Sequence, residues 1–136
     1  MTMTHTDLPQ LNGQLFVTDS GLETELIFHD GLDLPCFASF PLLDDDAGRE
    51  RLRRYAQNFV DVARRHGVGA MLETATWRAN PDWADQLGYD SEALARMNRR
   101  SVVELTLSVT RTPISWPRWS AGPSARVATA MPRPHA

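Results

Sequence analysis

The sequence predicts an α/β fold in which short buried strands alternate with helices and pair in parallel. Two apolar, β-prone runs, 15–18 and 68–76, are separated by a long stretch with helical periodicity. A strand–helix–strand order of this length is typical of a βαβ unit with a parallel sheet. The chain has 136 residues, of which 42% are hydrophobic, and this is enough for one domain with its own core.

The first strand, 15–18, is expected to end in a tight turn at 19–21, where polar residues and glycine follow the apolar run. The residues before it, 1–13, are polar and are expected to be disordered. Apolar positions in 22–29 predict a short helix. Two prolines break any regular pattern in the loop 31–43.

Three aspartates at 44–46 supply N-cap candidates for a long amphipathic helix. Its apolar stripe consists of Leu52, Tyr55, Ala56, Phe59, Val62 and Ala63. Gly67 is a stop signal, and the second strand is expected over 68–76. Asn80 and Pro81 predict a turn or short helix, and Asp90 with Ser91 predicts the cap of a further helix.

Charge is distributed unevenly along the chain. Residues 1–108 contain 10 Arg and all 17 acidic residues, a balance of −7, whereas 109–136 contain 4 Arg and no acid. The net charge of −3 argues against a nucleic-acid partner, and no apolar stretch is long enough to span a membrane. The single cysteine, Cys36, leaves no internal disulfide, which fits a reducing cytoplasm.

Two motifs carry a resemblance to a known family. Residues 15–26 read Leu-Phe-Val-Thr-Asp-Ser-Gly-Leu-Glu-Thr-Glu-Leu, and 72–80 read Leu-Glu-Thr-Ala-Thr-Trp-Arg-Ala-Asn. They resemble the opening strand and loop, and the Thr-x-Thr segment, of the zinc-dependent homocysteine S-methyltransferase family. The match covers about residues 14–105. One departure is Ser20, where the family usually has glycine.

The resemblance implies the N-terminal portion of a (β/α)8 TIM barrel over 14–108. About two βα units are present, so the barrel would be incomplete, because such a fold takes roughly 250 residues. Sites in barrels lie at the C-terminal ends of the strands. The residues that the resemblance places there, as the site for the amino-acid part of homocysteine, are Asp19, Ser20, Gly21, Thr74, Thr76 and Trp77.

The activity implied by the resemblance is methyl transfer from a donor to the homocysteine sulfur, which gives methionine. In the family, zinc held by three cysteines keeps that sulfur as a thiolate. One cysteine cannot form such a site, so zinc is not expected to bind this chain, which we expect to be truncated and inactive alone.

Simpler interpretations of the same residues stay open. Asp19 would cap the short helix after the first strand, and Thr74 and Thr76 would be ordinary β-formers. Trp77 would be a packing residue. Ser20 would cost about 1 kcal/mol or more if the turn needs a positive φ at its position.

The tail 109–136 is basic and Pro-rich, does not resemble the family and is expected to be disordered. Codons for 118–131 can be chosen that, read two bases later, encode a string resembling the family's third strand, so a frameshift explains its composition. The alternatives are a non-catalytic fragment that binds a small molecule or a partner, and a non-functional product of a frameshifted gene. Unpaired strand edges would favour self-association.

Overall fold

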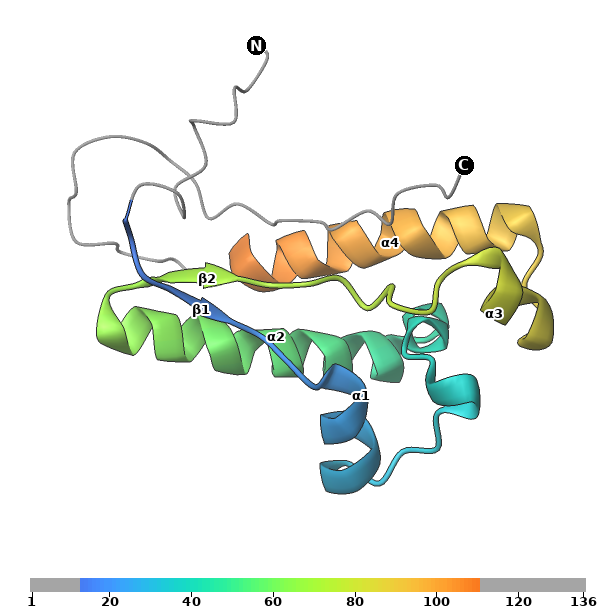
Figure 1. Cartoon of the computed structure of the whole chain (residues 1–136), viewed down its shortest axis with the longest axis horizontal. Coiled ribbons are helices and arrows are strands. Elements are labelled where there is room, and N and C mark those ends of the chain that lie inside the picture. Colours follow the sequence, from blue (N-terminus) through green and yellow to red (C-terminus); the bar gives the residue numbers. More distant parts are fainter. Residues whose placement is uncertain (1–12, 111–136) are drawn as a thin grey trace, which may run out of the picture.

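The computed structural model describes residues 13–110, in which two long helices lie alongside a pair of short strands (Figure 1). The strands β1 (Phe16–Thr18) and β2 (Gly69–Met71) pair in parallel and are joined by the helix α2 (Asp46–His66). The helix α4 (Ser91–Thr110) packs against α2, and both helices run opposite to the strands.

The close contact of β1 and β2 depends on a glycine. Phe16 lies opposite Gly69 in the register, and a Cβ atom added to Gly69 would lie 2.2 Å from the Phe16 ring. The ring therefore occupies the space that a side chain at position 69 would need. Ala70 faces the other way and packs with the buried residues Ala56 and Leu105 of α2 and α4.

The helix signals in the sequence are confirmed. The side chain of Asp45 caps α2 by accepting a hydrogen bond from the Gly48 N–H, and Gly67 ends that helix in the left-handed conformation with φ 64°. A short helix, α3 (Pro81–Gln86), begins after Asn80, whose side chain accepts from the Trp83 N–H.

The segment between β1 and α2 is more helical than a loop. The turn after β1 leads into α1 (Leu22–Thr24), which continues as a π-helical turn over Glu25–His29. Two 3-10 turns follow, Pro35–Phe37 and Phe40–Asp44. This segment and the first half of α4 enclose a buried cluster whose largest members are Leu26, Phe40, Leu43 and Met97.

The barrel fold predicted for 14–108 is wrong for the part of the chain that the structure describes. Residues 13–110 are mostly helical, with two strands of three residues each and no (β/α)8 pattern. The predicted strand 68–76 stops at Met71 as a strand. Its second half turns back on itself, because the Thr76 N–H donates to the Thr74 carbonyl at 2.7 Å.

The predictions of disorder at both ends concern mainly residues outside 13–110, and so does the frameshift hypothesis. The predicted tail begins at 109, whereas α4 continues to Thr110. Among residues 13–110, each helix is either too short or too polar to span a lipid bilayer.

Candidate functional site

A cleft of about 400 Å³ opens at the C-terminal ends of β1 and β2, beside α1. Sequence analysis predicted six binding residues on two segments more than fifty positions apart, and all six line this one cleft. They are Asp19, Ser20, Gly21, Thr74, Thr76 and Trp77. The remaining lining residues are Leu22, Glu23, Tyr55 and Glu73.

Asp19 connects the ends of the two strands. Its Oδ1 accepts the backbone N–H of Glu73 at 3.0 Å, and its own N–H donates to the carbonyl of Met71 at 3.3 Å. Burial raises the pKa of the Asp19 carboxyl group, and the neighbouring Glu73 charge adds to this effect. The carboxylate does not cap α1, whose N-cap is Gly21 without a side-chain hydrogen bond.

The turn after Asp19 places its left-handed residue at Gly21, which has φ 70°. Ser20 does not have a positive φ, so the strain expected for a serine at this position does not arise. The Tyr55 hydroxyl of α2 donates to the Ser20 carbonyl at 2.7 Å and so links the turn to α2. Burial, followed by the charge of Asp19, raises the pKa of Tyr55, so its hydroxyl stays protonated.

Thr74 and Thr76 form a pair of hydroxyl groups on the other side of the cleft. Their Oγ1 atoms lie 2.7 Å apart and share one hydrogen bond. Since one hydroxyl proton lies between the two oxygens, the other proton is left to donate to a ligand. In an extended strand, residues 74 and 76 would lie on the same face. The tight turn at 74–76 brings their side chains closer still, so that the two hydroxyl groups form a hydrogen bond.

Trp77 lines the cleft but is 64% exposed. Its neighbour Arg78 stacks between two indoles, with the guanidinium carbon 4.5 Å from the centre of the Trp77 ring and 4.1 Å from that of Trp83. Arg78 also donates to the Cys36 carbonyl at 2.7 Å. These contacts hold the Trp77 side chain through a cation–π interaction rather than through burial.

The cleft is acidic. Asp19, Glu23 and Glu73 contribute carboxylates, and none of its described lining residues is basic. Glu23 is oriented by Ser39, whose hydroxyl donates to Oε1 at 2.7 Å. An arrangement of carboxylates with hydroxyl groups and an aromatic wall favours a ligand that carries a protonated amine.

The residues that line the cleft do not fit the zinc site of the homocysteine S-methyltransferase family. Cys36 is not among the residues that line the cleft, whose potential metal donors are oxygen atoms. Across residues 13–110, no group of three or more His, Cys, Asp or Glu side chains is arranged to hold a metal ion. Thiolate ligands of the kind that hold the family's zinc are therefore absent from the described lining of the cleft.

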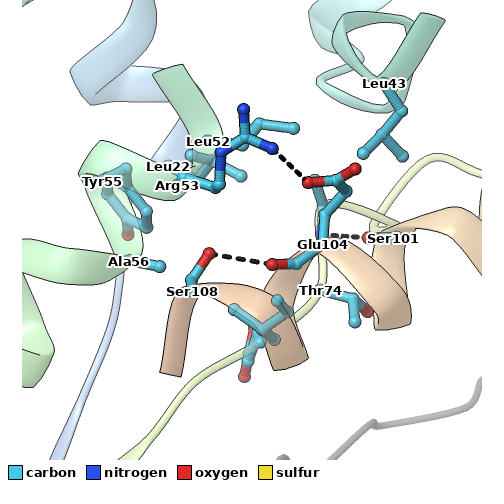
Figure 2. Close-up of a pocket in the computed structure, with 13 residues that line it drawn as sticks. Leu22, Leu43, Leu52, Arg53, Tyr55, Ala56, Thr74, Ser101, Glu104 and Ser108 are labelled. Carbon is cyan, nitrogen blue, oxygen red and sulfur yellow. Dashed lines mark hydrogen bonds and ion pairs between the residues drawn. The ribbon is translucent and has the colours of Figure 1, made fainter. Parts of the chain in front are cut away.

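A second, smaller cavity of about 30 Å³ lies behind Thr74, between α2 and α4 (Figure 2). Arg53 of α2 reaches across it to Glu104 of α4, with 2.6 Å between Nη1 and Oε2. Two serines of α4 also face this cavity. Ser101 Oγ accepts the Ala75 N–H at 3.0 Å, and Ser108 Oγ donates to the Glu104 carbonyl at 2.9 Å.

Sequence reasoning did not assign three of the polar residues that line the cleft. Tyr55 lies on the apolar stripe of α2 and was interpreted as core, although its hydroxyl reaches the site. Glu73 lies two residues after the end of β2 at Met71, and its position near a strand end was a usable signal for it. Glu23 lies in the first turn of a very short helix, and no signal in the sequence distinguishes it from a helix-dipole partner.

Comparison with family models, with curated proteins and with solved structures found no match. The family resemblance carried by the two motifs is therefore a prediction about this chain. The carboxylates and hydroxyl groups of the cleft support a functional proposal that does not depend on these comparisons.

Proposed function

We propose that the cleft binds homocysteine by its amino-acid end, and that this chain is a member of the homocysteine S-methyltransferase family. The observation that carries the proposal is the convergence of two distant motifs on one acidic cleft. Asp19, Ser20 and Gly21 lie on one side, and Thr74, Thr76 and Trp77 lie on the other.

The charges of the cleft define how the ligand would lie. Its ammonium group would bind between the carboxylates of Asp19 and Glu73, where charge-assisted hydrogen bonds are strongest. Its carboxylate would accept the spare hydroxyl proton of the Thr74–Thr76 pair. The aliphatic chain and the sulfur would pack along the Trp77 ring, since sulfur–aromatic contacts are favourable.

Methyl transfer needs more than this binding mode. The sulfur reacts as a thiolate, and a cleft with three carboxylates raises the pKa of a bound thiol instead of lowering it. The described residues provide a binding cleft for the amino acid but no thiolate ligands for zinc. We therefore propose that residues 13–110 bind the amino acid and do not by themselves activate its sulfur or hold a methyl donor.

The same donor set favours a second candidate, a binding function without turnover. A site built from carboxylates and hydroxyls serves recognition of a small amino acid equally well. We place either function in the cytoplasm, because the single cysteine among 136 residues leaves no disulfide within the chain.

Isothermal titration calorimetry of the full chain with L-homocysteine under reducing conditions tests the proposal. We expect saturable binding of L-homocysteine and no detectable binding of N-acetylhomocysteine, in which the ammonium charge is removed. Equal affinity for the two compounds, or no heat with either, would refute the acidic cleft as an amino-acid site. Methionine formation on addition of a methyl donor separates the enzymatic candidate from the binding one.

A further inference from the structure

The loop that carries the threonine pair is held by α4 rather than by the sheet. β2 ends at Met71, so residues 74–79 have no ladder partner. Instead, the Ala75 N–H donates to Ser101 Oγ at 3.0 Å, and Asn98 Nδ2 donates to the Ala79 carbonyl at 3.2 Å. Asn98 and Ser101 are three positions apart in α4, so they present one face of the helix to both ends of the loop.

We propose that Ser101 is a positioning residue that fixes the Thr74–Thr76 hydroxyl pair for the carboxylate of the ligand, an inference that rests on the proposed function. Ala75 is the central residue of the tight turn whose flanking residues are the two threonines. Its N–H is buried and has the Ser101 hydroxyl as its acceptor. Moving this N–H would move both threonine side chains together.

Ser101 is 3% exposed and touches no ligand position, because it lines the small cavity behind the cleft and not the cleft itself. Thr74 lines both cavities and separates the serine from the ligand. The effect of Ser101 on binding therefore passes through the backbone of the loop. It should appear as a change in specificity for the group that the threonines contact.

The same helix supplies a matched control. Ser108 is 4% exposed. It lies in α4 and lines the same small cavity (Figure 2). Its hydroxyl donates within its own helix, to the Glu104 carbonyl, and does not reach the loop. Ser101→Ala and Ser108→Ala are thus the same chemical change at similar burial, and they differ in contact with the loop.

The test compares two ligands by calorimetry: L-homocysteine, and 3-aminopropane-1-thiol, which has the same amine and thiol but no carboxylate. We expect Ser101→Ala to weaken homocysteine binding about tenfold, the fold-change that one lost hydrogen bond produces, and to leave the aminothiol affinity unchanged. Ser108→Ala should change neither affinity. Ser101→Thr keeps the hydroxyl at a position that lines the small cavity and should restore homocysteine binding.

Equal loss for both ligands in Ser101→Ala, or equal behaviour of Ser101→Ala and Ser108→Ala, would overturn the positioning role while the amino-acid site stands. If the unmodified protein binds no homocysteine, the proposed function is wrong. In that case amide hydrogen exchange still tests whether Ser101 positions the loop. Faster exchange at Ala75 together with shifted Thr74 and Thr76 resonances in Ser101→Ala, but not in Ser108→Ala, supports it. Unchanged exchange at Ala75 refutes it.

Discussion

The carboxylate of Asp19 accepts the backbone N–H of Glu73 at 3.0 Å, so one side chain joins the ends of both strands. The two residues are 54 positions apart, and each strand contributes only three residues to the ladder. This contact therefore ties the segment after β2 to the end of β1 beside the acidic cleft.

Asp19→Asn is expected to separate binding from folding. The amide oxygen still accepts the Glu73 N–H, but the charge that would pair with the ligand ammonium is lost. We expect homocysteine binding to weaken at least tenfold by calorimetry, since a hydrogen bond between charged groups contributes roughly 1.5–3 kcal/mol. Asp85→Asn, at an exposed acid of α3 outside the cleft, is the control and should bind normally.

The effect of Asp19→Asn on the free energy of unfolding should change with pH in one predictable direction. Burial raises the folded-state pKa of Asp19 above its ordinary value of 3.8, so the folded state holds this proton more tightly than the unfolded state. The contribution of Asp19 to the free energy of unfolding is therefore largest below pH 3.8 and is lost as the pH rises through the folded pKa. Urea melts should show Asp19→Asn gaining stability relative to the unmodified protein as the pH rises. A relative loss over that window would contradict the sign.

The sequence was sufficient to predict the helices because their signals are local. Asp45 caps α2 and Gly67 ends it within the segment that they bound. The strands were less predictable. Residues 72–76 were expected to extend β2 but form a turn instead. The N–H of Ala75 in this turn donates to the hydroxyl of Ser101, which lies on the distant helix α4. The partial (β/α)8 barrel implied by the resemblance was wrong for the described residues for the same reason, since strand length depends on partners and not on local sequence.

The candidate site was predictable only where residues followed a strand. Asp19 and Thr74 stand at such places, and the cleft contains both. Tyr55 was missed because a tyrosine on an apolar helix stripe is usually core, and its function at the site depends on a hydroxyl that reaches the Ser20 carbonyl. Periodicity carries no information about such a contact.

The purified 136-residue chain is expected to contain far less than one equivalent of zinc. The donors in the cleft are oxygen atoms, and the single cysteine of the chain, Cys36, is not part of it. Inductively coupled plasma mass spectrometry after dialysis against trace zinc measures this directly, with Cys36→Ser as the control that should not alter the content. One equivalent of tightly held zinc, lost in Cys36→Ser, would contradict the donor assignment.

Gly69→Ala should destabilise the sheet through one contact. The added Cβ would lie 2.2 Å from the Phe16 ring, so the ring must leave its position over β2. Overpacking of this kind costs typically 1–3 kcal/mol in the free energy of unfolding. Urea denaturation of Phe16→Ala, Gly69→Ala and the double variant completes a mutant cycle, and Gly69→Ala should cost much less when the ring is already absent. Additive costs would show that another neighbour meets the methyl group.

Arg78→Ala is expected to release Trp77 without unfolding the chain. The guanidinium lies between the Trp77 and Trp83 rings and donates to the Cys36 carbonyl, so its removal takes away both the stacking and the link to the 35–37 turn. Each cation–π contact is worth about 0.5–1 kcal/mol at an exposed site, and we expect a red-shifted tryptophan emission with homocysteine binding weakened a few-fold. Arg78→Lys should rescue poorly, because an ammonium group cannot stack flat between two indoles. Arg96→Ala, at an exposed position of α4, is the matched control. If Arg78→Ala and Arg96→Ala give the same emission spectrum and the same affinity, Trp77 is held in the cleft by something other than Arg78.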